Sequence, residues 1–245
     1  MTLPAPDAIG FDYGRTLARI VHPGGALVAA GQAVLTLLEV DSSHLPVPES
    51  DFGNRVEEEV DRLVDEAHKR DPRHEVQILD IYGQVLRGLL GETIRESQVE
   101  LACEVLQGAW GGSVEADRGA VATLPLLRRQ GLRLGMLSNA PYPAKTMRAM
   151  FERQGLAQSF DTIVLSSEVG WRKPSPEVFR ALLSQLGVAA SKCWFVGDEL
   201  EADLKGATAM GMTAIAAPGA LPPGSYQPQL GTWEELPRLV EASRA

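Results

Sequence analysis

An aspartate at the end of an apolar run is the first residue of this chain whose type and position could do chemistry. Residues 9–12 read Ile-Gly-Phe-Asp, and the chain then bends through Tyr-Gly-Arg before Thr16. A carboxylate exposed at the end of a buried strand is well placed to act as a nucleophile or to bind a metal ion. Asp12 is therefore the first candidate catalytic residue.

Further polar residues follow apolar runs later in the chain. Ser138 and Asn139 come directly after Leu-Gly-Met-Leu, and Lys173 lies in the segment Gly-Trp-Arg-Lys-Pro-Ser-Pro-Glu-Val-Phe. The segment Cys-Trp-Phe-Val-Gly-Asp-Glu-Leu-Glu-Ala-Asp places Asp198 and Asp203 after another apolar run. Because open parallel sheets hold their sites at the carboxyl ends of strands, we expect these residues to lie together.

This set of side chains indicates phosphoryl-transfer chemistry. A phosphate group is anionic, so its site must supply positive charge and hydrogen-bond donors. Lys173 can supply the charge, and Ser138 with neighbouring backbone N–H groups can donate to phosphate oxygens. Asp12 and Asp198 together would form an all-oxygen site for Mg²⁺, and Asp12 could then attack phosphorus. Each segment alone is more typical of a turn, a cap or exposed surface, whereas the ordered set favours one site.

The elements that would position these residues alternate in the second half of the chain. Apolar runs predict strands over 132–137, 162–165, 193–196 and 212–216, and amphipathic segments predict helices over 118–130, 143–154, 176–186 and 201–210. A glycine follows each predicted helix, at positions 131, 155, 187 and 211. Glycine is favoured there because a left-handed helix cap disfavours a Cβ atom. The alternation indicates a parallel sheet with helices on both faces.

The segment after the first strand has a different pattern, because its apolar residues recur at helical spacing as far as about residue 115. It predicts four helices over roughly 24–40, 50–70, 73–90 and 96–109, with a loop over 41–48. The expected fold is α/β, a Rossmann-like parallel sheet core with an inserted α-helical cap domain. The predicted core domain comprises residues 1–18 and 116–245, and the predicted cap domain comprises residues 19–115.

The composition is that of an ordinary globular protein, with 245 residues of which 44% are hydrophobic and 22% charged. A formal net charge of −9 argues against nucleic acid and anionic membranes as general partners. No apolar stretch is long enough to span a membrane, and the N-terminus lacks the pattern of a signal peptide. Cys103 and Cys193 are predicted to be buried reduced thiols. We therefore expect a cytoplasmic protein, and its oligomeric state is left open.

With these motifs the chain resembles the haloacid dehalogenase-like hydrolase superfamily, with a helical cap inserted after the first strand. Leu-Ser-Asn resembles the phosphate-binding motif of that family, and the segment around Lys173 resembles its lysine loop. Val-Gly-Asp, followed five residues later by Asp203, resembles its acidic metal motif. The resemblance covers the whole predicted core and extends weakly into the predicted cap.

The resemblance implies a metal site and a nucleophile. Asp12 would be the nucleophile and a ligand of Mg²⁺, Asp198 would be a second ligand, and the carbonyl of Gly14 would be a third. Asp203 would orient a ligand, a water or the lysine, and Thr16 would tie down the loop after the nucleophile.

For the phosphate group, the resemblance implies that Ser138, Asn139 and Lys173 hold its oxygens and that Ser138 and Lys173 stabilise the transition state. The implied activity is Mg²⁺-dependent hydrolysis of a small phosphorylated metabolite through an aspartyl-phosphate. The only partner it implies is that small-molecule substrate.

The first motif departs from the family pattern Asp-x-Asp-Gly-Thr, since Gly14 replaces the second aspartate and Arg15 replaces the glycine. That second aspartate protonates the leaving oxygen and then activates water, so its loss should reduce the rate by roughly 10²–10⁴-fold. We expect weak activity on ordinary phosphate esters and a smaller penalty for acyl or aryl phosphates. Arg15 is expected either to face solvent or to add a cation that attracts an anionic substrate or occupies the site.

Other functions stay open at this point. A non-catalytic phosphate-binding protein would also explain Gly14 and Arg15. A haloacid dehalogenase needs no proton for halide departure, but it uses no metal and would leave Asp12 and Asp198 as a repelling pair. A phosphonate hydrolase would need a cap lysine, and Lys69 is the only lysine of the insert. Several cap side chains could instead replace the missing acid: Lys69, Arg70, Arg73, His74 and Tyr82.

Overall fold

The computed structural model describes residues 3–20 and 25–245, and it divides into two compact units. Unit 1 comprises residues 1–20, 115–140 and 151–245, and unit 2 comprises residues 21–114 and 141–150. Residue 24, where the first predicted cap helix begins, and the first two residues of the chain lie outside the described residues. The domain limits inferred from the sequence stay a prediction.

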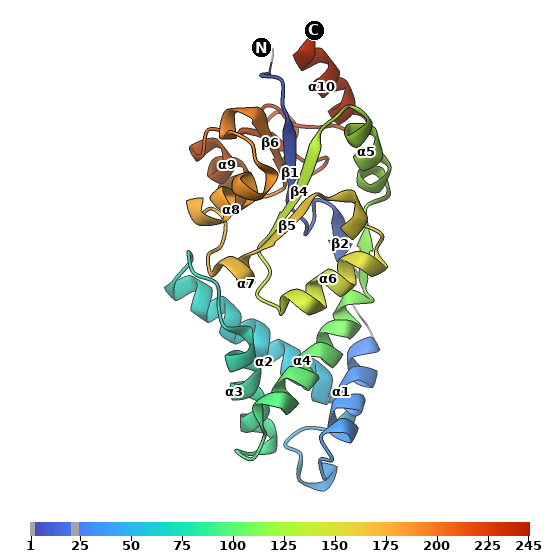
Figure 1. Cartoon of the computed structure of the whole chain (residues 1–245). Coiled ribbons are helices and arrows are strands. Elements are labelled where there is room, and N and C mark those ends of the chain that lie inside the picture. Colours follow the sequence, from blue (N-terminus) through green and yellow to red (C-terminus); the bar gives the residue numbers. More distant parts are fainter. Residues whose placement is uncertain (1–2, 21–24) are drawn as a thin grey trace. The chain divides into compact units, whose positions relative to one another are not determined.

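Unit 1 is built on a five-stranded parallel sheet with the strand order β5-β4-β1-β6-β7 (Figure 1). The strands are β1 (Ala8–Phe11), β4 (Arg133–Ser138), β5 (Thr162–Leu165), β6 (Cys193–Gly197) and β7 (Thr213–Ala216). In the middle of the sheet, Gly10 of β1 lies opposite Gly135 of β4 and Phe195 of β6. After β1 the chain forms β4 and β5 on one side of β1, and it then forms β6 and β7 on the other side. The strand order therefore reverses at β1, and the carboxyl ends of β4, β1 and β6 lie next to one another there.

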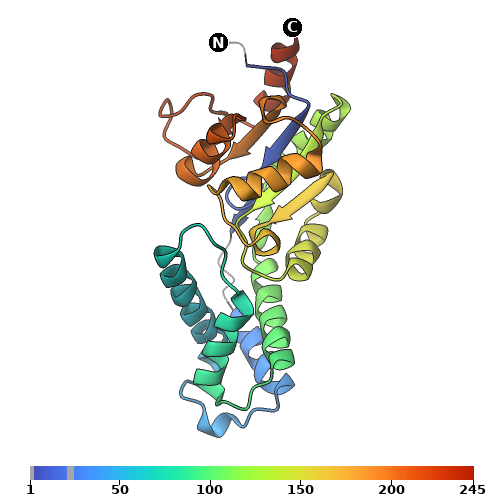
Figure 2. The same cartoon turned by 60° about the vertical axis from the view of Figure 1, so that its left-hand side comes forward.

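Helices cover both faces of this sheet (Figures 1 and 2). They are α8 (Pro176–Leu186) with α9 (Gly206–Ala209) on one face, and α5 (Arg118–Arg129) with α10 (Glu235–Arg244) on the other. On the α8 side, the rings of Phe179 and Phe195 meet edge to face with centroids 5.3 Å apart. Phe11 packs against Phe160 and Trp233 on the opposite side. Because both faces are buried, the strands are continuous apolar runs without polar alternation.

The strands and helices predicted for the second half of the chain are confirmed, with ends that differ by at most one residue. The predicted helix over 201–210 is a π-helix over Leu200–Lys205 followed by the short α9. The four glycines after the helices have positive φ angles of 64° to 80°. Two short strands and two α-helices of the described residues were not predicted from the sequence: β2 (Ala18–Ile20), β3 (Val114–Ala116), α7 (Ser166–Val169) and α10.

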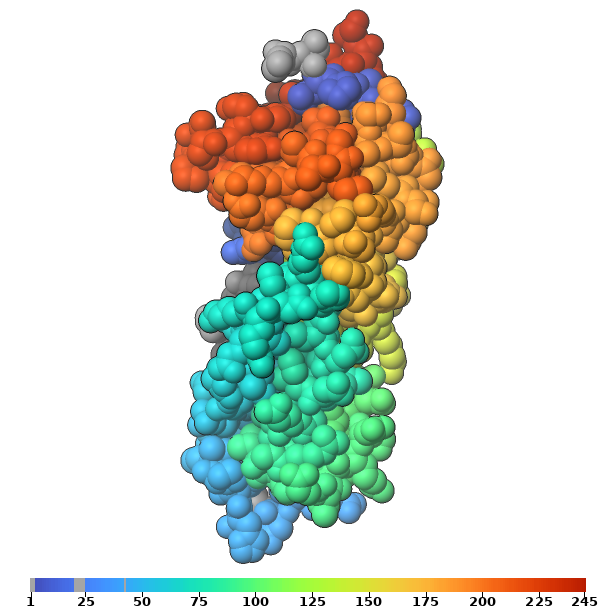
Figure 3. Space-filling view, turned by 90° about the vertical axis from the view of Figure 1, so that its left-hand side faces the viewer, coloured from blue at the N-terminus to red at the C-terminus, as the bar shows by residue number. Residues whose placement is uncertain are grey.

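Unit 2 contains the predicted helical bundle. Its helices are α1 (Ala26–Leu37), α2 (Glu49–Arg70), α3 (Ile78–Leu90) and α4 (Glu96–Gly111), together with most of α6 (Ala144–Arg153). Val34, Phe52, Leu86 and Leu106 are fully buried in its apolar core. The atoms of α2 and α3 lie side by side in the space-filling view, in cyan and green (Figure 3). The inserted helical cap is therefore present.

The third cap helix begins at Ile78, so the predicted start at residue 73 is wrong. Pro72 disfavours helical backbone at Asp71, which is extended and ends α2. The Asp71 carboxylate then accepts hydrogen bonds from the backbone N–H groups of Arg73 and His74, at 3.2 and 3.3 Å. These N–H groups are thereby satisfied outside a helix, which favours a turn at this point.

Two predictions from composition are also tested. Cys103 and Cys193 are both buried and free, as predicted. Burial is the largest cause that raises the pKa of each thiol to about 12, so both are protonated at neutral pH and unreactive as nucleophiles. None of the helices in residues 3–20 and 25–245 combines the length and the apolar character needed to cross a bilayer.

A buried carboxyl group lies among the helices of unit 2. Glu57 on α2 is 3% exposed and accepts hydrogen bonds from the hydroxyl of Tyr82 and from Gln107 Nε2, the latter at 3.1 Å. Burial is the largest cause that raises the pKa of Glu57 from 4.5 to about 7, and the charge of Asp61 adds to it. Tyr82, one of the cap side chains considered as a replacement for the missing acid, is fully buried beside Glu57 and makes the contacts of a core residue.

Replacing Glu57 with glutamine should make unit 2 more stable at alkaline pH. Because the folded-state pKa is raised, the contribution of Glu57 to the free energy of unfolding is fully present below the ordinary pKa of 4.5 and is lost as pH rises towards 7. Between pH 4.5 and 7 this loss of stability is about 3 kcal/mol. The substitution Glu57→Gln removes the titrating group and should therefore remove this part of the pH dependence. Denaturant unfolding near pH 5 and near pH 8 measures the effect.

The matched control for this prediction is Glu58→Gln on the same helix, because the Glu58 side chain is 70% exposed. This control should leave the pH dependence of unfolding as it is in the wild type. An equal slope of stability against pH in the wild type and in Glu57→Gln would contradict a raised Glu57 pKa.

Candidate active site

Three of the predicted site residues lie at the carboxyl edge of the sheet. Asp12 directly follows β1, Ser138 is the last residue of β4, and Asp198 directly follows β6. The strand order places β1 between β4 and β6, so Asp12 is flanked by the other two. The backbone N–H of Asp12 donates to the carbonyl of Val196 at 2.9 Å and fixes the chain at the strand end. Asp12 is 6% exposed and Ser138 is 4% exposed.

Lys173 is brought to the same edge by the segment between α7 and α8. Its ammonium group contacts the carboxylate of Asp12, 161 positions away in the chain, and lies 2.7 Å from Oδ1 of Asp203. Burial is the largest effect on Lys173 and lowers its pKa, but the two carboxylates together raise the pKa above its ordinary value. Lys173 is therefore a buried cation held between two acids.

Asn139 holds the lysine segment in place. Its Oδ1 accepts a hydrogen bond from the backbone N–H of Lys173 at 2.8 Å, and its Nδ2 donates to the Lys173 carbonyl at 3.2 Å. This reciprocal pair joins the end of β4 to the Lys173 backbone. The prediction that Asn139 also contacts a phosphate group stays a prediction.

Asp203 holds the loop that follows β6. It lies in the π-helix, is 1% exposed, and its Oδ2 accepts hydrogen bonds from the backbone N–H groups of Asp198 and Glu199 at 3.1 and 3.0 Å. A Cβ atom at Gly197 would lie 2.5 Å from the Asp203 carboxyl group, so only glycine permits this approach. Asp203 thus holds the backbone of Asp198 by a hydrogen bond and the ammonium group of Lys173 by an ion pair.

The turn after Asp12 directs its side chains to different places. Tyr13 packs edge to face on Phe151, with ring centroids 4.7 Å apart, and its hydroxyl donates to Gln154 at 2.8 Å. The Thr16 hydroxyl donates to Oδ1 of Asp198 at 3.3 Å. A Cβ atom at Gly14 would meet no other heavy atom within 4 Å, apart from its chain neighbours. The position of the missing second aspartate therefore has open space around it.

Arg15 reaches the acidic site from this turn. Its backbone is left-handed, with φ of 59°, and its side chain is 62% exposed. Arg15 Nε lies 3.0 Å from Oδ2 of Asp198, and the guanidinium also contacts the carboxylate of Glu199. Burial is the largest cause that raises the pKa of Asp198, whereas Arg15 lowers it. The arginine is both solvent-facing and paired with a candidate metal ligand, so it combines the two alternatives that the sequence left open, and its pairing with Asp198 comes from the structure.

The acidic residues at this edge fit a divalent metal ion. Asp12, Asp198 and Asp203 each offer a carboxylate oxygen, and these oxygens lie within 4.8 Å of one another. Asp203 is 1% exposed, and both of its carboxylate oxygens are held inside the protein, Oδ1 by the buried Lys173 and Oδ2 by two backbone N–H groups. Asp198 is held instead by the exposed Arg15, and only one oxygen of Asp12 contacts Lys173, so Asp12 and Asp198 are the better candidates. Burial is the main cause that raises the pKa of Asp12 to about 7, with Lys173 opposing it. An all-oxygen donor set suits Mg²⁺, which would offset the repulsion between the carboxylates.

A sequence model of the haloacid dehalogenase-like hydrolase family matches residues 8–211 of this chain. A stretch of 104 residues is 36% identical to haloacid dehalogenase-like hydrolase domain-containing protein 3 of Bos taurus, covering 42% of this chain and 40% of that protein. A stretch of 96 residues is 38% identical to a phosphoserine phosphatase of Thermus thermophilus, covering 39% of this chain and 38% of that phosphatase. The chain thus spans about 40% of the length of these curated relatives.

The structure is similar to a crystal structure of 2-haloacid dehalogenase from Pseudomonas syringae pv. tomato DC3000, with a TM-score of 0.66. The likeness covers 96% of this chain and 98% of the dehalogenase, at 24% sequence identity. At this level of identity the similarity concerns the fold.

Proposed function

Because the chain belongs to the haloacid dehalogenase-like hydrolase family, we propose that it is a Mg²⁺-dependent phosphatase of small phosphorylated metabolites. The observation that carries this proposal is the contact of Lys173 with Asp12 at the carboxyl edge, between Ser138 and Asp198. A nucleophile, a cation, a hydroxyl and a second carboxylate are the groups that phosphoryl transfer needs. The likeness to a phosphoserine phosphatase supports phosphoryl chemistry.

In this mechanism an Asp12 oxygen attacks phosphorus, and the bond between phosphorus and the leaving oxygen breaks. Lys173 and Ser138 stabilise the transferring group because they present positive charge and a hydrogen-bond donor to its oxygens. A bound Mg²⁺ supplies further positive charge to the site. Lys173 also favours the ionised form of the buried Asp12, because its charge lowers the carboxyl pKa. Water then cleaves the aspartyl-phosphate, which frees Asp12 and releases inorganic phosphate.

The residue at position 14 limits both steps. Gly14 carries no side chain, so the leaving oxygen departs without a proton from this position and the attacking water has no base there. A missing general acid–base group reduces the rate by roughly 10²–10⁴-fold. Substrates whose leaving oxygen is already a weak base, such as acyl and aryl phosphates, need this proton least. We therefore propose them as the better substrates.

A substrate series tests the proposed function. In the presence of Mg²⁺, the rate of leaving-group release in the first turnover should rise steeply as the leaving-group pKa falls from alkyl phosphates to substituted phenyl phosphates and acetyl phosphate. Removal of the metal with EDTA should abolish the activity, and added Mg²⁺ should restore it. A stopped-flow measurement of the first turnover separates release of the leaving group from hydrolysis of the aspartyl-phosphate. Equal rates with EDTA and with Mg²⁺ on every active substrate would exclude the proposed mechanism.

A second candidate function is a non-catalytic phosphate-binding protein. The observations that favour it are the missing side chain at Gly14 and the ion pair between Arg15 and Asp198. It is distinguished by calorimetry with inorganic phosphate and by the substrate series above. Binding of phosphate without turnover of any substrate, acetyl phosphate included, would favour this candidate over the phosphatase.

A further inference from the structure

We propose that Arg15 competes with Mg²⁺ for Asp198, so that the metal ion must displace a guanidinium belonging to the protein itself. The inference rests on the proposed function, because it concerns the same metal site. It assigns to Arg15 a role that reduces metal affinity and makes occupation of the site depend on the Mg²⁺ concentration.

Both oxygens of the Asp198 carboxylate are engaged. Oδ1 accepts a hydrogen bond from the Thr16 hydroxyl at 3.3 Å, and Oδ2 lies 3.0 Å from Arg15 Nε. A metal ion coordinated by Asp198 needs an oxygen lone pair directed at it. It would also lie within a few ångströms of the guanidinium, and two cations at such a distance repel each other. Metal binding and the Arg15 contact therefore oppose each other.

The backbone of the turn holds Arg15 in reach of Asp198. Arg15 N–H donates to the carbonyl of Ala18 at 2.8 Å, and Leu17 N–H donates to the carbonyl of Tyr13 at the same distance. A left-handed φ of 59° disfavours any residue that carries a Cβ atom, so the backbone itself does not favour arginine here. The ion pairs with Asp198 and Glu199 offset this disadvantage.

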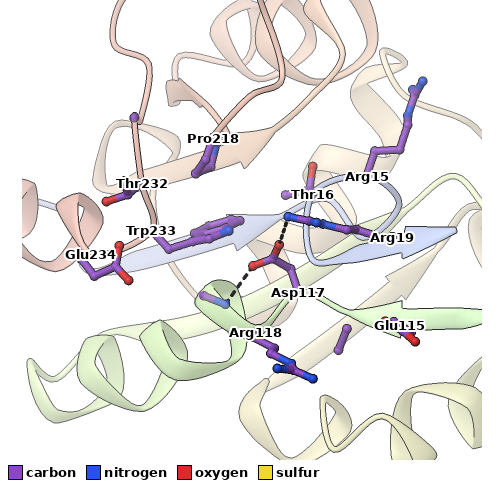
Figure 4. Close-up of a pocket in the computed structure, with 13 residues that line it drawn as sticks. Arg15, Thr16, Arg19, Glu115, Asp117, Arg118, Pro218, Thr232, Trp233 and Glu234 are labelled. Atoms are coloured by element: carbon purple, nitrogen blue, oxygen red, sulfur yellow. Dashed lines mark hydrogen bonds and ion pairs between the residues drawn. The ribbon is translucent and has the colours of Figure 1, made fainter. Parts of the chain in front are cut away.

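The guanidinium also has space into which it can move. Arg15, Thr16, Arg19 and Asp117 are among the residues that line an open pocket of about 460 Å³ in unit 1, and the Arg15 guanidinium points away from the side chains of Arg19 and Asp117 (Figure 4). Because the Arg15 side chain is 62% exposed, it can leave Asp198 without disturbing the core. The Asp198 side chain is only 11% exposed, but water reaches the arginine side of the pair and screens it, so a divalent ion can displace the guanidinium. Arg15 thus lowers the apparent metal affinity without closing the site.

The same pocket supplies a matched control. Arg19 is 79% exposed and lies 3.1 Å from Oδ2 of Asp117, which caps the first turn of α5 (Figure 4). It resembles Arg15 in charge and exposure, but its ion pair is with Asp117. Arg19→Gln therefore removes one positive charge from the pocket and leaves the Asp198 contact in place.

Isothermal titration calorimetry with Mg²⁺ on the full chain, without substrate, tests the inference. Arg15→Gln should bind Mg²⁺ about tenfold more tightly than the wild type, because a positive charge next to the ion is removed. Arg15→Lys keeps a positive charge at this position, so its affinity for Mg²⁺ should remain closer to that of the wild type. The Mg²⁺ affinity of Arg19→Gln should stay within about twofold of the wild-type value. Asp198→Asn should lose Mg²⁺ binding, because it removes a proposed ligand.

Each failure has its own signature. If Arg15→Gln binds Mg²⁺ with the wild-type affinity or more weakly, the competition is wrong and the proposed function stands. If Arg15→Lys binds as tightly as Arg15→Gln, charge is not the cause and the competition is again wrong. If Mg²⁺ binds to none of the variants and not to the wild type, both the competition and the Mg²⁺-dependent function are wrong.

Discussion

Replacing Gly14 with aspartate and Arg15 with glycine should raise kcat for an alkyl phosphate by about 10²–10⁴-fold over the wild type. The double variant restores a carboxylate two residues after Asp12, where it can protonate the leaving oxygen and then activate water. Space permits it, because a Cβ atom at Gly14 meets no other heavy atom within 4 Å. Tyr13 does not obstruct it, since its ring packs on Phe151 and its hydroxyl is bonded to Gln154.

Glycine at position 15 serves two purposes in this variant. It fits the left-handed φ of 59°, and it removes the guanidinium that contacts Asp198, so no cation stands directly beside the new carboxylate in the chain. The measurement is steady-state kinetics at saturating Mg²⁺, so that a change in metal affinity does not alter the comparison. Arg15→Gly alone provides the reference for the effect of the arginine.

The control for the new acid is the same background with asparagine at position 14. Asparagine has nearly the size of aspartate but cannot act as an acid or a base at neutral pH, so Gly14→Asn with Arg15→Gly should not gain activity. The gain should be largest for alkyl phosphates and smallest for acyl phosphates, because a poor leaving group benefits most from a proton. Equal rates for the aspartate and asparagine variants on all substrates would show that the missing acid is not what limits turnover.

Asp12→Asn should reduce phosphatase activity by at least about 10³-fold, because it removes the nucleophile. Wild-type turnover is expected to be slow, so the substitution is also made in the faster double variant that carries Gly14→Asp and Arg15→Gly. Incubation with labelled acetyl phosphate followed by acid quenching should leave label on the wild-type chain and none on Asp12→Asn. This measurement detects the covalent intermediate and does not depend on the rate of turnover.

The control for this prediction is Asp7→Asn, which changes a carboxylate that lies just before β1 and is exposed. It should keep full activity and full labelling. Asp12→Asn should also keep its fold, because Lys173 retains Asp203 as a partner at 2.7 Å. A melting temperature within about 5 °C of the wild type would show that the loss is chemical. Undiminished turnover in Asp12→Asn would eliminate Asp12 as the nucleophile.

Local patterns of the sequence were sufficient for most of the fold. The strand over Thr162–Leu165 and the helix over Pro176–Leu186 have the predicted ends, since an apolar run, a proline and a following glycine specify them within a few residues. The sequence predicts an ordinary helix where the π-helix lies at Leu200–Lys205, because six residues are too few for the difference in helical period to show. The pairing of β2 with β3 was missed, because these strands have only three residues each and lie far apart in the chain.

The candidate site was predictable because its residues follow strand ends. A parallel sheet brings all such ends to one edge, so the order of Asp12, Ser138 and Asp198 along the chain was enough to place them together. The contacts among them were not predictable in the same way. The reciprocal bonds between Asn139 and the Lys173 backbone depend on how the segment between α7 and α8 folds back onto β4.

Arg15 and Glu57 show what only the tertiary structure decided. The sequence left open whether Arg15 faces solvent or occupies the site, and its contact with Asp198 depends on a turn closed by backbone hydrogen bonds. Glu57 lies three residues before Val60, on the apolar face of its helix, but its hydrogen-bond partners Tyr82 and Gln107 are 25 and 50 positions away in the chain. The physical reason is common to both. Residue types and their spacing determine which elements form and which edge carries the chemistry, whereas the charge state and partner of a side chain depend on groups that only folding brings within reach.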